Sequence, residues 1–171
     1  MKKAMDATAL NELLVHRETV FRICLGFSSN YDEAEDLAQE VFVKAAGAAD
    51  SLRDPDRIRE WLLRIARNTC IDHGKQRRTR AALLFRFASE KPVMAADPLA
   101  PVEDGRVEFL KEAIACLPDR LRDVFVLREY ADLSYAEIGR SLHLKEGTVM
   151  SRLNRARAFV ARVVKENTHA G

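Results

Sequence analysis

The sequence predicts an all-α protein of two small helical domains joined by a flexible linker, with a helix-turn-helix in the C-terminal domain. Apolar residues recur at helical spacing in several separate stretches. Hydrophobic residues make up 47% of the 171 positions, enough for real cores, and there are 7 glycines and 5 prolines. The periodicity is lost over 81–105, which contains Pro92, Pro98 and Pro101. We therefore predict domains over 1–80 and 106–171, with the linker at 81–105.

Two amphipathic helices are predicted near the N-terminus. The first spans Leu10–Phe27, and its inner face would hold Leu10, Leu13, Leu14, Phe21, Cys24 and Phe27. The second spans about Tyr31–Ala46, with acids in its first turn, where the helix dipole favours them. Its inner face would hold Ala34, Leu37, Ala38, Val41 and Phe42, and its outer face Asp36, Gln39, Glu40 and Lys44. Such an acidic face is most often simply solvated.

A third helix is predicted from near Asp56 to about Gly74. Trp61 lies in its apolar face, and the simplest interpretation is that its side chain anchors the hydrophobic core. The other face and the residues that follow are strongly basic, which suits either a solvated tail or a path along phosphates. The apolar patch Leu83–Phe87 in the predicted linker would either dock on another surface or extend this helix.

The C-terminal domain is predicted to begin with two helices and to continue with the helix-turn-helix. The first contains Phe109, Leu110, Ala113, Ile114 and Leu117 and is closed by Pro118, and the second contains Leu121, Val124, Phe125 and Leu127. Ser134–Arg157 then reads as two helices around a break at His143–Glu146. Ser134 with Glu137 forms a capping box. This pattern alone does not distinguish a DNA-binding motif from an ordinary solvated helix pair.

The second helix of this pair has an apolar stripe and an opposite polar face. Val149, Leu153, Ala156 and Val160 repeat at i, i+4, i+7 and i+11. At about 100° per residue, the opposite side carries Ser151, Asn154, Arg155 and Ala158. Small, hydrogen-bonding side chains beside arginines are typical of a helix that enters the major groove of DNA.

Charge is strongly segregated along the chain, although the net charge is +2. Asp32–Glu40 contains five acids and no base, whereas the charged residues of Arg140–Lys165 are seven bases and the single acid Glu146. This indicates at least two different partners, one of them polyanionic. Cys24, Cys70 and Cys116 are far apart in apolar helical patterns and are predicted to be buried, reduced thiols. Because no run is apolar enough to span a membrane and no signal-peptide pattern is visible, we expect a cytoplasmic protein without membrane insertion.

Enzymatic chemistry has little support in the sequence. The four histidines show no metal-ligand spacing with one another or with the cysteines, and no glycine-rich phosphate loop or serine elbow is present. Asp36 and Glu40 could chelate Mg²⁺, but no partner carboxylates accompany them. We therefore predict a binding protein with no catalytic residue, no metal and no cofactor.

Four stretches together resemble one family. They are DEAEDLAQEVFVKA at Asp32–Ala45, WLLRIARNTCID at Trp61–Asp72, LPDRLRDVFVLREYADLSYAEIG at Leu117–Gly139 and GTVMSRLNRARAFV at Gly147–Val160. Their order and separation are similar to those of the two-domain extracytoplasmic-function (ECF, group IV) RNA polymerase sigma factors. The resemblance implies that 1–80 is sigma region 2, for core binding and for recognition and melting of the −10 element. It also implies that 106–171 is sigma region 4, for recognition of the −35 element.

Specific roles follow from this resemblance. Asp36, Gln39, Glu40 and Phe42 would dock on the clamp helices of the polymerase beta-prime subunit. The beta flap of core polymerase would be a further contact. A base extruded from the −10 element would enter a pocket formed by the loop Ser51-Leu52-Arg53 and Asn68. Lys75, Arg77 and Arg78 would hold the backbone of that strand. Leu52 stands where the family commonly has an aromatic residue.

The resemblance also assigns the −35 contacts. Met150, Ser151, Asn154 and Arg155 would face bases, and Met150 stands where the family usually has lysine or arginine, so its contact would be apolar. Lys145, Thr148, Arg152 and Arg157 would contact phosphates or pair between helices. Function is expected to be stress- or envelope-responsive and to be controlled by an anti-sigma factor.

Two other functions remain to be weighed against this one. A conventional helix-turn-helix regulator acting without polymerase would explain Ser134–Arg157, but it leaves the acidic helix and Trp61–Arg80 without a role. A metal-dependent nuclease would need a carboxylate cluster that the sequence lacks.

Overall fold

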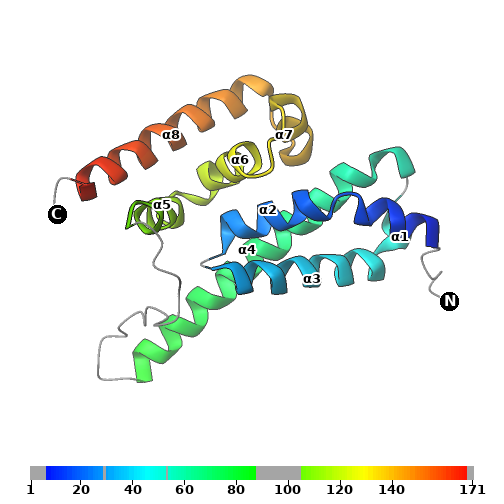
Figure 1. Ribbon diagram of the computed structural model, residues 1–171, viewed down its shortest axis with the longest axis horizontal. Coiled ribbons are helices and arrows are strands. Elements are labelled where there is room, and N and C mark those ends of the chain that lie inside the picture. The colour runs from blue at the N-terminus through cyan, green and yellow to red at the C-terminus, as the bar shows by residue number, and fades with distance from the viewer. Residues whose placement is uncertain (1–6, 29, 53, 88–104, 169–171) are drawn as a thin grey trace.

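The computed structural model describes residues 7–28, 30–52, 54–87 and 105–168, and these residues form helices and connecting turns without strands (Figure 1). The all-α prediction is therefore confirmed. The N-terminal unit comprises α1 (Ala7–Leu14), α2 (Arg17–Phe27), α3 (Tyr31–Gly47) and α4 (Ile58–Phe87), with short 3₁₀ turns at Ala49–Ser51 and Pro55–Arg57. The C-terminal unit comprises α5 (Gly105–Ala115), α6 (Asp119–Glu129), α7 (Tyr135–Leu142) and α8 (Glu146–Thr168).

The core of the N-terminal unit lies between α2, α3 and α4. The side chain of Asn30 caps α3 by accepting a 2.8 Å hydrogen bond from the backbone N–H of Glu33, and α3 carries its acids in the first turn as predicted. Each helix turns one apolar face to the other two, and fully buried residues come from all three helices: Val20, Ile23, Cys24, Ala34, Val41, Ala45, Leu62 and Ala66. This packing fixes the outward direction of the acidic face of α3.

The predicted single helix Leu10–Phe27 is wrong, because the chain forms two helices there. The backbone N–H of His16 bonds the carbonyl of Leu13 at 3.0 Å, which tightens the turn and ends α1. This bend leaves Leu13 fully buried but turns Leu14 out to 48% exposure, so Leu14 does not belong to the inner face.

Helix α4 is longer than predicted: it continues past Gly74 and ends at Phe87. It thus runs into the predicted linker. Of the two predictions for Leu83–Phe87, docking on another surface or extension of the preceding helix, the structure shows the extension. The remainder of that linker up to residue 104 lies outside the described residues. Of the three cysteines, Cys24 and Cys70 are buried, whereas Cys116 is exposed, contrary to the prediction.

In the C-terminal unit, α8 packs across α5, α6 and α7. Its predicted apolar stripe is the buried one, with Val149, Leu153 and Ala156 fully covered. Arg122 joins α6 to the end of α5, since its guanidinium donates to the backbone carbonyls of Ile114 (3.1 Å), Ala115 (2.5 Å) and Leu117 (3.0 Å). The Ile114 carbonyl also accepts the Leu117 backbone N–H at 3.1 Å, so Arg122 adds a second donor at this helix C-terminus.

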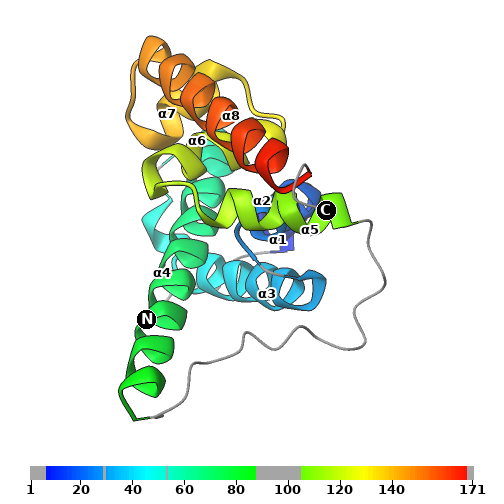
Figure 2. The same cartoon turned by 90° about the vertical axis from the view of Figure 1, so that its left-hand side faces the viewer.

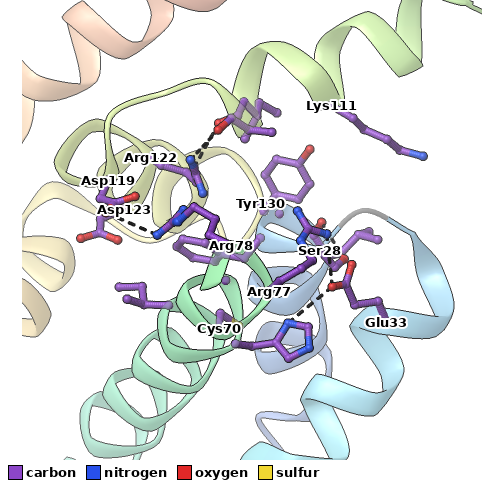
Figure 3. Close-up of a pocket in the computed structure, with 18 of the residues that line it drawn as sticks. Ser28, Glu33, Cys70, Arg77, Arg78, Lys111, Asp119, Arg122, Asp123 and Tyr130 are labelled. Atoms are coloured by element: carbon purple, nitrogen blue, oxygen red, sulfur yellow. Dashed lines mark hydrogen bonds and ion pairs between the residues drawn. The ribbon is translucent and has the colours of Figure 1, made fainter. Parts of the chain in front are cut away.

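The two units pack against each other, with α6 and α7 resting on α2 and α4 (Figures 1 and 2). Helix α6 is buried on all sides over Asp123–Leu127, because one face lies in the core of its own unit and the other on the N-terminal unit. We call this contact the seam. It includes a cavity of about 330 Å³, whose lining includes Phe27 and Arg77 of one unit and Lys111 and Tyr130 of the other (Figure 3).

Candidate functional site

The helix-turn-helix is built by local interactions that its sequence specifies. The Ser134 hydroxyl accepts the Glu137 backbone N–H at 3.3 Å, and the Glu137 carboxylate accepts the Ser134 backbone N–H at 2.8 Å, so the predicted capping box is confirmed. At the other end of α7, His143 adopts the left-handed conformation at φ 54°, and the Leu144 N–H bonds the Gly139 carbonyl at 2.8 Å. This closure turns the chain into α8.

Gly139 is required by this turn for steric reasons. A Cβ atom at this position would lie 2.8 Å from the carbonyl oxygen of Leu144. A backbone atom cannot move aside as the end of a flexible side chain can, so any larger residue would push α7 and the turn apart. The angle between α7 and α8 therefore depends on this glycine.

The predicted −35 contacts lie along the outer side of α8, with Met150 49% exposed and Asn154 and Arg155 exposed. The Ser151 hydroxyl donates to the Thr148 carbonyl at 3.0 Å, which leaves its oxygen free to accept a hydrogen bond. Lys145 is exposed, and Thr148 and Arg152 are half-buried. The structure therefore brings these residues onto one helix and its approach, and Figure 1 shows that helix on the side of its unit away from α1–α4.

Arg157 has a different role from its neighbours on α8. Its guanidinium donates twice to Glu129 of α6, at 2.9 and 2.6 Å. These charge-assisted bonds raise the pKa of Arg157. Of the two predicted roles, phosphate contact or pairing between helices, the structure shows the second.

The acidic face of α3 is exposed, with Asp36, Gln39, Glu40 and Lys44 on the outer side as predicted. Asp36, Gln39 and Glu40 all point to solvent, and Glu40 pairs with Lys44 at 2.7 Å on the same helix. Phe42 is half-buried against the core of its own unit. Val43, by contrast, is 71% exposed.

The sequence analysis did not place Val43 on the exposed side of α3, although the spacing of the acidic residues indicates it. Asp36, Gln39, Glu40 and Val43 follow the i, i+3, i+4, i+7 pattern and so share one side of α3. An exposed apolar side chain bordered by acids suits a basic partner with an apolar centre. We call these four residues the α3 stripe.

The loop predicted to hold an extruded base is anchored by Trp61. Its indole N–H donates to the Ser51 hydroxyl at 3.0 Å, while its ring is buried at 6% exposure. The predicted core anchor therefore also fixes the loop, a second role that the sequence analysis missed. Leu52 is half-buried beside it, and Arg53 lies outside the described residues.

A hollow of about 460 Å³ opens between this loop and α4. We call it the loop hollow. It is lined by Ser51, Leu52, Asp54, Arg57, Glu60, Trp61 and Arg64 of the N-terminal unit and by Arg140, Ser141 and His143 of the C-terminal unit. Asn68, predicted to complete the pocket, is exposed on α4 and does not line it.

The other predicted −10 residues follow Asn68 along α4, and each has an acidic neighbour. Lys75 lies 3.6 Å from Asp72, Arg77 lies 3.5 Å from Glu33 of α3, and Arg78 lies 3.9 Å from Asp119 of α6. All three are exposed. Such surface pairs are weak, so these cations can exchange a carboxylate for a phosphate.

Two of the cysteines form a buried pair. The Sγ atoms of Cys24 and Cys70 lie 3.7 Å apart in the core of the N-terminal unit. The hydrogen bond to Cys24 and burial both raise the pKa of the Cys70 thiol, which keeps it protonated at neutral pH. Among the described residues, no group of three or more His, Cys, Asp or Glu side chains is placed to hold a metal ion.

Comparison with known proteins identifies both units. Residues 14–80 match Sigma-70 region 2, and residues 110–160 match Sigma-70, region 4. The ECF RNA polymerase sigma factor SigW of Bacillus subtilis (strain 168) is 30% identical to this chain, over 96% of this chain and 93% of SigW. The chain belongs to the ECF sigma factors.

Other relatives of this sigma factor agree. The ECF RNA polymerase sigma-E factor of Escherichia coli (strain K12) is 32% identical over 91% of this chain and 86% of its own length. RpoE of Bartonella quintana, solved with the anti-sigma factor NepR, superposes with a TM-score of 0.66 at 25% identity, over 91% of this chain and 95% of its own. CnrH, solved with the cytosolic domain of CnrY, gives a TM-score of 0.66 at 26% identity, over 94% of this chain and 90% of the CnrH chain.

The family settles the overall activity. This sigma factor directs core RNA polymerase to promoters and takes part in transcription initiation. Its DNA-binding helix-turn-helix belongs to region 4. No helix within the described ranges is long and apolar enough to cross a membrane.

Proposed function

We propose that this sigma factor uses three surfaces, one for polymerase and two for promoter DNA. The α3 stripe would bind the clamp helices of beta-prime, the loop hollow with the basic side of α4 would take the −10 strand, and the outer side of α8 would read the −35 duplex. We also propose the domain division 1–80, 81–105 and 106–171 that accompanies these roles. The observation that carries the proposal is the match of both units, in order, to regions 2 and 4.

The polymerase surface is supported by the geometry of α3. Asp36, Gln39 and Glu40 are exposed on one side of a helix whose other side is fixed in the core, and Val43 adds an exposed apolar centre. Carboxylates around an apolar side chain complement a basic helical partner. Phe42 would contribute indirectly, by holding α3 on its unit, because it is half-buried.

The −10 surface is supported by the loop hollow and its anchor. The bond from Trp61 to Ser51 fixes the loop on α4, so the part of the hollow that the N-terminal unit lines would be formed before a base enters it. Unstacking a base costs a few kcal/mol, which a preformed pocket and the cations Lys75, Arg77 and Arg78 would offset. Because Leu52 has no aromatic ring, it would contact the base by apolar packing instead of stacking. Asn68, outside the hollow, would contact the strand beside it.

The −35 surface is supported by the exposed side of α8. Met150, Ser151, Asn154 and Arg155 offer an apolar contact, a hydroxyl acceptor, an amide and a guanidinium, which together can distinguish base pairs in the major groove. Lys145, Thr148 and Arg152 at the start of the helix would contact phosphates. The region 4 unit would also be the part that meets the beta flap.

Control by an anti-sigma factor is proposed as well. The solved structures of RpoE and CnrH, to which this chain is similar, were determined with NepR and with the cytosolic domain of CnrY. We further propose that the protein acts in the cytoplasm in response to stress or envelope signals, and that it is not itself an enzyme and needs no cofactor. The alternative of a helix-turn-helix regulator without sigma activity leaves the region 2 match without a function.

The polymerase surface is tested by charge reversal. Asp36→Lys with Glu40→Lys should lower affinity for core polymerase at least about tenfold, equivalent to about 1.4 kcal/mol, because two attractive contacts become repulsive. The matched control is Glu12→Lys with Glu18→Lys, two exposed acids on α1 and α2. Affinity for a −35 duplex should be unchanged in both. Equal core affinity in the two double variants would rule out the α3 stripe as the docking surface.

A further inference from the structure

Glycines in the described helices differ in what surrounds them. At Gly26 and Gly139 a Cβ atom would lie 2.6 Å from Val126 Cγ1 and 2.8 Å from the Leu144 carbonyl oxygen, so packing excludes a side chain. Gly147, the second residue of α8, has no such neighbour, because a Cβ there would meet nothing within 4 Å. Its φ is not positive either. The free chain therefore gives Gly147 no steric or conformational reason to be glycine.

Glycine is also an unfavourable residue for this position. It loses more conformational freedom in a helix than alanine does, so alanine at position 147 would favour α8. Gly147 is exposed to solvent, and an added methyl group would displace no other residue. Positions that break a local preference without a structural gain are commonly functional. The reason for this glycine then lies outside the free chain, in what α8 binds.

Gly147 lies on the side of α8 that is proposed to face DNA. Gly147, Met150, Ser151 and Asn154 follow the i, i+3, i+4, i+7 pattern, so they share one side of the helix. The last three are residues proposed to face bases. Gly147 precedes Met150 by about 4.5 Å along the axis, at about 1.5 Å per residue. It therefore stands where this side of the helix begins, before the first base contact.

An α-helix fills the major groove almost completely. With its side chains a helix is about 10–12 Å across, and the major groove of B-DNA is about 12 Å wide. The sugar–phosphate strands that form the groove walls therefore touch a helix that reaches the base edges. Lys145 and Thr148, proposed to contact phosphates, flank Gly147 in the sequence. A strand held by both of them would pass close to the residue that has no side chain.

Helix α8 cannot move aside within its unit to accept a larger residue at this contact. Val149 and Leu153 on its opposite side are fully buried. The Leu144 N–H bonds the Gly139 carbonyl at 2.8 Å, which fixes the turn before the helix. A methyl group at position 147 would therefore displace the DNA and not the helix, and it would draw the base-reading side chains away from the base edges.

We propose that Gly147 is a positioning residue for −35 reading, at which a DNA strand lies directly against the backbone of α8. Its missing side chain sets how deeply α8 enters the major groove, and so whether Met150, Ser151 and Asn154 reach the base edges. The inference deepens the proposed −35 role of α8 and rests on it. It adds to that surface a residue that meets DNA through its backbone alone.

Two substitutions of increasing size test the contact. Gly147→Ala adds a methyl group and Gly147→Leu a larger side chain, and both residues are better helix formers than glycine. The matched control is Gly74→Ala in α4, where a Cβ also meets nothing within 4 Å. In urea unfolding followed by circular dichroism, both alanine variants should have midpoints equal to or above that of wild type. A lower midpoint for Gly147→Ala would show that the fold itself requires this glycine, and would overturn the proposal.

Promoter binding is measured with the holoenzyme, formed from core polymerase and either wild type or a variant. Fluorescence anisotropy compares two duplexes, a promoter on which wild type supports run-off synthesis and the same promoter with its −35 element scrambled. Gly147→Ala should lower affinity for the intact promoter at least about tenfold, the loss of one base contact, and Gly147→Leu should lower it further. Affinity for the scrambled promoter should change less than about twofold, because α8 has no base contacts to lose there. Gly74→Ala should keep the wild-type ratio between the two duplexes.

The outcomes separate this inference from the proposed role on which it rests. A wild-type affinity ratio in Gly147→Ala, or an equal loss on both duplexes, would overturn the inference. If scrambling the −35 element left wild-type binding unchanged, the proposed −35 role of α8 would fail, and the inference with it. The two failures are distinguishable, because the first appears only in the variant and the second already in wild type.

Discussion

Gly139→Ala probes the part of the fold that sets the angle of the recognition helix. Alanine favours a helix over glycine by about 0.5–1 kcal/mol, so an unobstructed substitution would stabilise α7. Here the new Cβ would lie 2.8 Å from the Leu144 carbonyl oxygen, a backbone atom whose own residue closes the turn through its N–H. Overpacking of this kind costs about 1–3 kcal/mol. Subtracting the helix gain from the steric cost leaves a net loss of stability of about 1 kcal/mol, within a range of about 0–2.5 kcal/mol.

The assay is urea unfolding of the full chain, followed by far-ultraviolet circular dichroism, with a −35 duplex binding measurement on the same variant. The urea series gives the change in the free energy of unfolding. If the same samples are unfolded by heating, a loss of 1 kcal/mol corresponds to a fall of about 2–4 °C in the melting temperature at this chain length. Gly74→Ala, whose Cβ meets nothing within 4 Å, should instead be neutral or stabilised by up to about 1 kcal/mol. If Gly139→Ala proved as stable as Gly74→Ala and bound the −35 duplex equally well, the steric account of the turn would be wrong.

Two further predictions concern specificity and pH. Arg155→Ala should cost about 1–3 kcal/mol of binding free energy on the cognate −35 duplex and much less on random DNA. Lys145→Ala should weaken binding to both duplexes equally. An equal loss on both duplexes for Arg155→Ala would show that Arg155 contacts a phosphate and not a base. The pKa of His16 is lowered from its ordinary 6.5, first by burial and then by the charge of Arg59, so the folded state binds fewer protons than the unfolded state. Stability should therefore fall as pH drops below 6.5 through the lowered pKa of His16, and His16→Gln should flatten that part of the profile in urea titrations at successive pH values.

Local features of the fold could be predicted from the sequence because they depend on neighbouring residues. The capping box of Ser134 and Glu137 and the buried stripe of α8 follow from spacing alone. The break between α1 and α2 could not be predicted, because no glycine or proline marks it and the helical pattern continues across His16. The tightened turn there accompanies the full burial of Leu13 in the core, a tertiary contact that the local sequence does not indicate.

The seam was beyond sequence reasoning for a different physical reason. Periodicity shows that a face is buried but not which surface covers it, so Val126 and Asp123 gave no sign of a second contact on α6. Gly26 lies inside a predicted helix, and the sequence does not indicate that its missing side chain makes room for α6. The candidate site divides in the same way. Met150, Asn154 and Arg155, proposed to read the −35 element, are exposed on the side of α8 opposite its apolar stripe, which the spacing alone indicates. The pairing of Arg78 with Asp119, by contrast, depends on how the units pack.

The central claim is that this chain makes core RNA polymerase initiate at specific promoters, and run-off synthesis with purified components tests it most directly. Core polymerase alone, this protein alone and the two together are compared on a template that carries suitable −35 and −10 elements. A defined transcript that requires both proteins, and that is lost with Asp36→Lys and Glu40→Lys, is the predicted result. Promoter-specific binding by the isolated protein without any transcript on addition of core polymerase would contradict the account.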